Sequence, residues 1–415
     1  MYNKPAMLLR NFVVLLALPV AAQYRAGVSR IDITPKPGHA MGGYSARSGN
    51  ATGTHDPLQA TVLVLESNGE RFAWITADLR SFLSTRVGQE VKRRFGIGHT
   101  VISVSHTHSG PLTWEARESP WYAIAEDKMI AAVEQASLNL RPATLATGHA
   151  NVYIGFNRRK ISEDGTATMQ WRNETKRPSH PVDSEVTVLV VQSEGKPKAV
   201  LVNYACHPSI LGPDNLAFSA DYPGAMRQAL EQALPGALAL FVQGGAGDIN
   251  PYRDKEPVPA GFDAARNTGA ELAKAAATAV QRAKPIAGPL KITSEITEVA
   301  NRWKPTGTIS IGITTAMIGD GAFCLLALPG EPFVEHQLTF REKSECGTSM
   351  LAGYSYSVGG TWAGYIPTIK AAVEGGYGAN YNTTVAVGTG EMLIDHGVIR
   401  LLQMRGLLKE LPDAQ

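Results

Sequence analysis

The chain has 415 residues, of which 44% are hydrophobic and 18% are charged, and its formal net charge is +2. This composition is ordinary for a globular protein and supplies enough apolar residues for a large core. No run of lysine or arginine stands out, so the sequence gives no reason to expect a nucleic-acid partner.

The N-terminus has the pattern of a secretory signal peptide. Lys4 and Arg10 precede an uncharged stretch from Phe12 to Ala22, which ends in small residues. A basic segment, a short apolar segment and small residues before a cleavage site are typical of such peptides, and this stretch is too short to span a membrane as a helix. We predict a signal peptide over residues 1–22, a secreted or periplasmic protein, and a single domain over residues 23–415. The alternatives are an uncleaved anchor and a buried N-terminal strand or helix.

Apolar runs of strand length alternate with helical patterns along the rest of the chain. The predicted strands are Thr61–Leu65, Phe72–Ala77, Val101–Val104, Val186–Val191, Ala199–Tyr204, Leu238–Val242, Ile292–Ile296 and Phe323–Leu328. The predicted helices are Val87–Arg94, Ile124–Leu138, Pro223–Leu234, Ala264–Ala283, Pro332–Phe340 and Glu391–Leu411. This alternation predicts an α/β fold, a layered single domain with a mixed β-sheet and flanking helices. The breaker-rich stretches Ile161–His180 and Tyr252–Phe262 are predicted to be loops.

Polar clusters follow four of the predicted strands. They are His106 to Pro111, Cys206-His207-Pro208, Gln243 to Asp248 and Pro329-Gly330-Glu331. In open α/β sheets, ligands bind just beyond the carboxyl ends of strands. Four such clusters from distant parts of the sequence therefore predict one shared site.

The first cluster contains two histidines, His106 and His108, at a predicted strand end. Alternate residues of a strand point to the same side, so one imidazole can bind a metal while the other faces the metal's ligand. A lone His-x-His is more often a strand cap and a surface residue, and only the other clusters favour the metal interpretation.

A catalytic zinc site needs about three protein ligands and an open position for water, whose pKa the metal lowers to about 7. His106, His207 and Glu331 supply a suitable set. Two alternatives remain open: Glu331 can instead be an acidic residue in the first turn of the helix predicted from Pro332, and His207 can be a buried, hydrogen-bonded histidine.

The glycine-rich segment from Gln243 to Pro251 lacks the lysine and the spacing of a P-loop. Within it, Asp248 can orient a histidine or the attacking water, as carboxylates do around metal sites; an Asx-turn before Pro251 explains it equally well. No Gly-x-Ser-x-Gly elbow of a serine hydrolase occurs.

The chain has three cysteines and no Cys-x-x-Cys, which excludes a thiolate zinc site. A single disulfide, either Cys324–Cys346 or Cys206–Cys324, is compatible with the sequence.

In order along the chain, these motifs resemble those of the neutral/alkaline non-lysosomal ceramidases, a family of secreted zinc amidases. The matching segments are Gly27 to Pro35, His106 to Pro111, Asn157-Arg158, Ala205 to Pro208, Gly247 to Pro251, Leu328 to Glu331 and Gly364 to Thr368. The resemblance extends from about Ala26 to Glu374 and implies the ceramidase catalytic-domain fold.

The resemblance also implies roles for individual residues. The zinc ligands would be His106, His207, Glu331 and Tyr365. His108 would donate a hydrogen bond to the scissile carbonyl or its oxyanion. Tyr377 would be a further active-site tyrosine, and Arg158 would contact polar groups of the substrate, although by itself it can equally be a surface residue.

The chain departs from the family pattern at two points. Asn250 stands where the family has an active-site serine, and asparagine forms hydrogen bonds but cannot act as a nucleophile. In addition, long-form members have a C-terminal β-sandwich-like domain after the catalytic domain. We expect no such domain within the sequence up to Gln415. Both departures weaken the expectation that ceramide itself is the substrate.

The sequence therefore predicts an exported zinc-dependent hydrolase that cleaves an amide bond of a small-molecule or lipid N-acyl substrate, with possible peripheral membrane contact. The alternatives are an esterase acting on a non-lipid substrate, and a catalytically impaired binding protein on the same scaffold, marked by Asn250.

Overall fold

The computed structural model describes residues 23–113 and 119–408. The predicted signal peptide lies outside the described residues. Within the described residues, no helix is long and apolar enough to cross a membrane.

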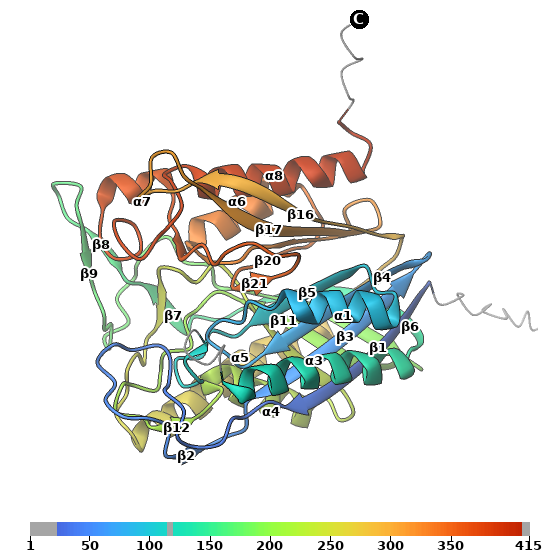
Figure 1. Ribbon diagram of the computed structural model, residues 1–415, viewed down its shortest axis with the longest axis horizontal. Coiled ribbons are helices and arrows are strands. Elements are labelled where there is room, and N and C mark those ends of the chain that lie inside the picture. Colours follow the sequence, from blue (N-terminus) through green and yellow to red (C-terminus); the bar gives the residue numbers. More distant parts are fainter. Residues whose placement is uncertain (1–22, 114–118, 409–415) are drawn as a thin grey trace, which may run out of the picture.

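A ten-stranded mixed sheet forms the centre of the molecule (Figure 1). In spatial order its strands are β13 (Leu238–Gln243), β11 (Lys196–Tyr204), β10 (Glu185–Ser193), β6 (Arg141–Asn151), β1 (Tyr24–Asp32), β3 (Gln59–Ser67), β4 (Glu70–Ala77), β5 (His99–Val104) and β21 (Ser355–Tyr356), with β15 (Lys284–Ile286) beside β6. The pairs β11–β13 and β4–β5 are parallel and the other pairs are antiparallel.

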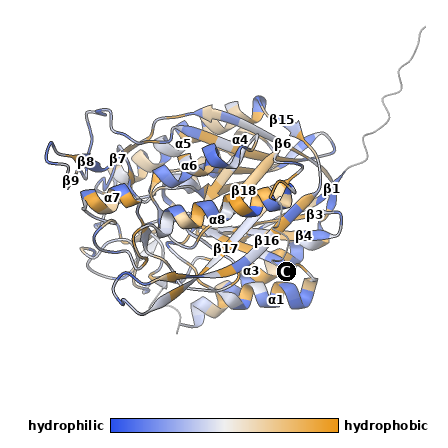
Figure 2. Cartoon of the chain, turned by 90° about the horizontal axis from the view of Figure 1, so that it is seen from above, coloured by the Kyte–Doolittle hydropathy of each residue, from blue (hydrophilic) through white to orange (hydrophobic). Residues whose placement is uncertain are grey.

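Further layers cover both faces of this sheet (Figure 1). On one face lie α1 (Thr85–Phe95), α3 (Pro120–Leu138), α4 (Asp221–Ala233) and α5 (Ala260–Gln281). On the other face lies a second sheet of β16 (Leu290–Ala300), β17 (Thr308–Ile318), β18 (Phe323–Ala327) and β20 (Ser349–Ala352). The outer side of this second sheet is covered by α6 (Val334–Ser344) and α8 (Thr389–Met404). Helix α8 lies across β16, β17 and β18 in Figure 2.

Burial on both faces explains why the central strands are continuous apolar runs rather than alternating patterns. In β3, Val62 and Val64 pack toward the helices, whereas Leu63 and Leu65 pack against the second sheet. The layered α/β fold with a mixed sheet and flanking helices is therefore confirmed.

Short elements connect the layers and carry much of the site. They are β2 (Gly53–Thr54), β7 (Gly155–Asn157), β8 (Arg159–Ile161), β9 (Ala167–Met169), β12 (Ala217–Phe218), β14 (Ile249–Pro251), β19 (Glu331–Pro332), β22 (Tyr365–Ile366) and α7 (Ile369–Glu374).

Each predicted strand and helix has a counterpart; the helix predicted over Glu391–Leu411 corresponds to α8, which ends at Met404, with its last three predicted residues outside the described residues, and the other bounds agree within four residues. The prediction missed β1, β6, β15, β17, β20 and β21 of the two sheets, together with the short connecting elements, and was wrong at several boundaries. The first predicted loop contains β9 and the last residue of β8, which form a hairpin, and α5 already begins at Ala260, inside the second one. The helix predicted from Pro332 begins at Val334, because Glu331 and Pro332 pair as a strand with β22.

The disulfide joins Cys324 to Cys346, and Cys206 is a buried free thiol. The sequence left this pairing open. It is decided by the fold, which brings the start of β18 next to the segment that follows α6.

An ion pair attaches α8 to the second sheet, because Arg400 donates hydrogen bonds to both carboxylate oxygens of Glu295 on β16. Arg400 and then His396 hold the pKa of Glu295 at about 2, below its ordinary value of 4.5. A carboxylate with a lowered folded-state pKa stabilises the fold above its unfolded pKa, and this contribution is lost as the pH falls toward the folded value.

We expect Glu295→Gln to lower the free energy of unfolding at pH 7 by less than about 1 kcal/mol, because both side chains of the pair remain partly exposed to solvent. The difference from wild type should disappear between pH 4.5 and about 2, as measured by urea unfolding. A difference that stays constant over this range would contradict the assignment.

Candidate active site

His106 lies just beyond the end of β5, held by the backbone of the segment that follows the neighbouring strand β4. Its amide donates to the carbonyl oxygen of Leu79 at 2.9 Å, and its Nδ1 lies 2.7 Å from the carbonyl oxygen of Arg80. The residue has a left-handed φ of 67°, so the chain turns here. His106 and His108 therefore do not approach by strand alternation as predicted; a turn places their ring centroids 5.2 Å apart.

His207 follows β11 in the same way. Its amide donates to the carbonyl oxygen of Ile249 at 3.0 Å, and its Nδ1 lies 2.6 Å from the carbonyl oxygen of Ala246. Both partners belong to the glycine-rich segment after β13. The polar cluster that follows β13 therefore orients His207 in the polar cluster that follows β11.

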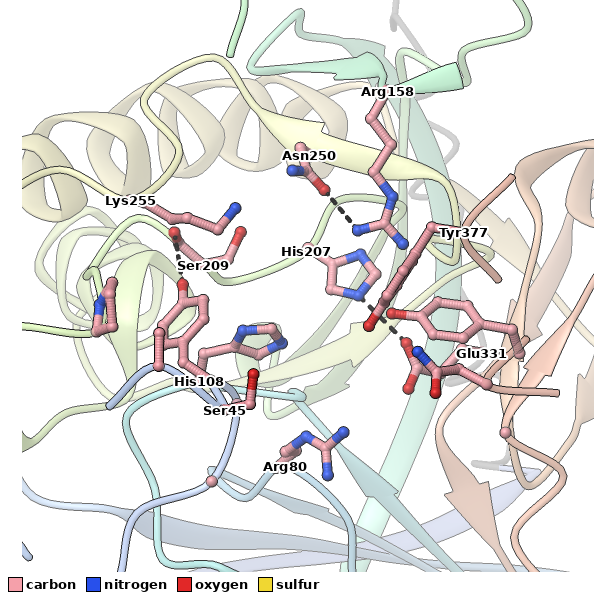
Figure 3. Close-up of a pocket in the computed structure, with 18 of the residues that line it drawn as sticks. Ser45, Arg80, His108, Arg158, His207, Ser209, Asn250, Lys255, Glu331 and Tyr377 are labelled. Carbon is pink, nitrogen blue, oxygen red and sulfur yellow. Dashed lines mark hydrogen bonds and ion pairs between the residues drawn. The ribbon is translucent and has the colours of Figure 1, made fainter. Parts of the chain in front are cut away.

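Glu331 faces both histidines from β19. Its Oε2 lies 3.5 Å from Nε2 of His106. It also lies 3.3 Å from Nε2 of His207, as Figure 3 shows. All three side chains are almost completely buried. Glu331 precedes α6 and lies in a strand, so its alternative interpretation as a first-turn helix residue is wrong.

The hydrogen bonds at Nδ1 determine what the Nε2 atoms can do. A neutral imidazole that donates from Nδ1 to a carbonyl has only a lone pair at Nε2. Burial lowers the pKa of His106 to about 3, which keeps this ring neutral. Lone pairs on Nε2 and on the Glu331 carboxylate then face one another, which is unfavourable without a cation between them. Fixing metal-binding histidines through backbone carbonyl groups is also common in metal sites.

Tyr365 reaches the site through strand pairing. In the parallel β19–β22 pair, Tyr365 is the direct partner of Glu331, although 34 positions separate them. Its ring is nearly parallel to that of His207, with the centroids 6.4 Å apart. Burial, followed by the charge of Glu331, raises the pKa of its hydroxyl well above 10.

His108 completes a cluster of three histidines that could hold a metal ion. One ring nitrogen from each of His106, His108 and His207 lies within 4.8 Å of the others. His108 packs edge-on against Tyr44, and its Nδ1 is buried without a hydrogen-bond partner among the described residues. Burial lowers its pKa well below 6.5, so it has a neutral ring that lines the cavity.

Arg158 is buried and does not lie on the surface. It lies on the opposite side of the cavity from His108 (Figure 3). It donates to Asn250 Oδ1 at 3.0 Å and to the carbonyl oxygen of Gly247 at 2.6 Å. Asn250 Nδ2 in turn donates to Asp254 at 3.1 Å, and Asp254 pairs with Lys255. Asn250 therefore uses both ends of its amide to connect the guanidinium group with a buried carboxylate.

Asp248 is not directed into the cavity. Its two carboxylate oxygens accept hydrogen bonds from the amide of Val334, at the start of α6, and from Asn157 Nδ2, at 2.9 and 2.7 Å. Burial raises its pKa to about 6. The prediction that this carboxylate orients water or a histidine is not supported by this geometry, since it holds the start of α6 and the β7 segment together.

The cavity has a volume of about 1140 Å³ and combines polar and aromatic surfaces. Tyr377 lies in its wall, with its ring centroid 5.3 Å from Tyr365 and 5.3 Å from Trp171, and the Arg158 guanidinium lies 5.1 Å from the Tyr377 ring centroid. A volume of this size accommodates a ligand as large as a typical drug molecule.

Two residues of the site were missed in the sequence. Gln243, at the end of β13, donates to the carbonyl oxygens of Ser105 and Cys206, which ties together the two segments that carry the histidines. Arg80 lines the cavity directly below the histidines. Gln243 was visible only as a polar residue at a strand end, and no local pattern distinguishes Arg80.

Comparisons with known proteins identify the family and the fold. The family model described as "Neutral/alkaline non-lysosomal ceramidase, N-terminal" matches residues 24–257, more than half of the chain. No curated protein matches the chain in sequence.

Solved ceramidases share the fold. One described as a ceramidase complexed with C2 has a TM-score of 0.77 and 17% identity, covering 95% of this chain and 77% of its own. The neutral ceramidase from Pseudomonas aeruginosa has a TM-score of 0.76 and 18% identity, covering 95% and 76%. The chain belongs to the neutral/alkaline non-lysosomal ceramidase family.

Proposed function

We propose that the protein is an exported, zinc-dependent hydrolase that cleaves the amide bond of an N-acyl substrate. Membership of a ceramidase family implies a hydrolase. The observation that carries the metal-dependent reaction is the position of Glu331 Oε2, 3.5 and 3.3 Å from two imidazole Nε2 atoms whose Nδ1 atoms are bound to carbonyl groups.

The residues present fit a divalent ion. His106, His207 and Glu331 offer two imidazole nitrogens and a carboxylate oxygen, the donor set of many catalytic zinc sites, and Tyr365, the strand partner of Glu331, would add a phenolic oxygen. A bound zinc ion would act as a Lewis acid toward the scissile carbonyl and lower the pKa of the attacking water.

The remaining side chains would bind and orient the substrate. His108 offers a ring nitrogen at the cavity surface and can donate to the oxygen of the scissile carbonyl as charge develops there; one such donor is worth about 3–4 kcal/mol in well-studied enzymes. Tyr377 can donate in the same way, and Arg158 presents a fixed guanidinium edge to polar substrate groups. The aromatic walls exclude water from an acyl chain.

The direct test is a panel of N-acyl amides and esters incubated with the zinc-loaded protein, with and without a chelator. Release of fatty acid that stops with the chelator and returns with added zinc would support the proposal. Metal-independent hydrolysis, or no hydrolysis of any member by zinc-loaded protein, would contradict it. Detection of the mature N-terminus after expression with the leader would test export.

Asn250 motivates the second candidate, a binding protein that has lost catalysis. Its hydrogen bonds to Arg158 and Asp254 favour a positioning role instead.

A serine at this place can also donate and accept hydrogen bonds, so we expect Asn250→Ser to keep kcat within about tenfold of wild type. Asn250→Ala should raise KM more strongly than Asn250→Ser does, because Arg158 loses its hydrogen-bond acceptor at this position. Steady-state kinetics on one amide would measure kcat and KM of both variants and of wild type. Activity in Asn250→Ser together with an inactive wild type would favour the binding protein.

A further inference from the structure

The cavity contains a guanidinium group for which the described part of the chain offers no partner. Arg80 lies three residues beyond the end of β4 and lines the cavity. Its backbone carbonyl oxygen holds His106 Nδ1, which fixes its place beside the proposed metal ligands. Within residues 23–113 and 119–408, it forms no ion pair, and its Nε is buried without a hydrogen-bond partner.

Arg227 and Arg341 also have a buried Nε without a hydrogen-bond partner, so the feature that sets the partly exposed Arg80 apart is that its other guanidinium nitrogens have no partner among the described residues either. Arg227 pairs with Asp78, Arg159 pairs with Glu374, and Arg341 pairs with Asp183. A guanidinium group carries several N–H donors, and those that Arg80 presents at the cavity are not used by any described residue. The exception at Arg80 therefore points to an acceptor supplied by a ligand.

The charges lining the cavity favour an anionic ligand. Three cationic side chains, Arg80, Arg158 and Lys255, surround the site on different sides, against the single carboxylate of Glu331 (Figure 3). Lys255 is matched by Asp254, but the acceptors of Arg158 that hydrogen-bond geometry identifies are the neutral groups of Asn250 and Gly247. A divalent ion would add further positive charge, and clefts lined by one sign of charge concentrate ligands of the opposite sign.

We propose that Arg80 binds an anionic group of the substrate, so that the preferred substrates are acidic amides of the N-acyl amino acid class rather than neutral lipid amides. This inference rests on the proposed amide hydrolysis. Because Arg80 adjoins the proposed metal ligands, the anion must lie only a few bonds from the scissile amide, as the carboxylate of an N-acyl amino acid does. Guanidinium groups bind carboxylates through two parallel hydrogen bonds. Met41, Leu112 and Trp303 provide apolar wall for the acyl chain.

The test compares substrates with one acyl chain and different head groups: N-lauroylglycine with a carboxylate, N-lauroyltaurine with a sulfonate, and the neutral N-lauroylethanolamine. We expect wild type to have a kcat/KM about tenfold or more higher for the anionic amides, the size of effect that a hydrogen bond to a charged group provides. Preference for the carboxylate over the sulfonate identifies the anion. Arg80→Gln should remove this preference through KM, and Arg80→Lys should restore part of it.

Arg93→Gln is the matched control, because Arg93 lies on the exposed side of α1, paired with Glu90. It should leave the preference unchanged. A wild-type preference for the neutral amide would overturn the inference, and so would an equal loss on all three amides in Arg80→Gln, since that would indicate a structural or transition-state role.

A binding measurement separates failure of this inference from failure of the hydrolase proposal. N-dodecylsulfonylglycine and the neutral N-dodecylsulfonylethanolamine contain no carboxamide and therefore resist amide hydrolysis, and calorimetry can compare their affinities. Tighter binding of the acid, lost in Arg80→Gln, would support the anion site even if no amide is cleaved. Equal binding of the two compounds by wild type would reject it even if amides are cleaved.

Discussion

Replacing His106 with alanine is expected to abolish both stoichiometric zinc binding and amide hydrolysis. His106 contributes an Nε2 atom directed at Glu331, and its Nδ1 is already committed to the Arg80 carbonyl group. Changes to residues that merely support metal ligands reduce metal affinity or activity by about 10–100-fold, so loss of a ligand should exceed about 100-fold. Metal content after gel filtration, together with kcat/KM, measures both effects.

His396→Ala is the appropriate control for this experiment. His396 pairs with Glu295 where α8 meets the second sheet, away from the cavity, and its loss should leave zinc content and kcat/KM close to wild type. Full zinc content with unchanged turnover in His106→Ala would reject the proposed centre. Circular dichroism of both variants would show whether a loss reflects unfolding.

The second large effect concerns stability. Asp78 and Arg227 form a buried pair with two parallel contacts of 2.5 and 2.6 Å, joining the end of β4 to α4. Asp78→Ala would leave the buried guanidinium without its carboxylate, and breaking a buried pair in this way costs about 3–5 kcal/mol. We expect a decrease of this size in the free energy of unfolding, measured with urea. Because Leu79 and Arg80 follow directly and hold His106, zinc affinity should also fall.

The matched control is Asp127→Ala, which removes the carboxylate partner of Arg86 on the surface. Exposed pairs of this kind contribute at most about 1 kcal/mol, so its effect on unfolding should be small. If Asp78→Ala were no more destabilising than Asp127→Ala, the buried pair would not be the structural connection that its geometry implies.

The family serine that Asn250 replaces could have either of two roles, and these make different demands on this position. A serine nucleophile would require a hydroxyl at this place, whereas a positioning residue requires only hydrogen bonds to Arg158 and Asp254. Since Arg158 also lies against the rings of Tyr365 and Tyr377, Asn250 influences the side of the cavity opposite the histidines. We therefore expect the replacement of the family serine by Asn250 to change how the substrate fits into the cavity rather than the attacking group.

The sequence by itself determined the α/β class, six helices, eight of the fourteen described strands in the two sheets, and the histidines of the site. Strands buried on both faces leave continuous apolar runs, and His106 and His207 directly follow such runs. These signals are local, because they depend on periodicity and on neighbours along the chain.

Only the tertiary structure decided which distant groups meet. The pairing of β19 with β22 places Tyr365 beside Glu331, the approach of β18 to the segment after α6 selects Cys324–Cys346, and packing directs Asp248 toward the start of α6. It also leaves Arg80 without a partner among the described residues. Strand register and the matching of buried polar groups depend on segments far apart in the sequence, which no local pattern records.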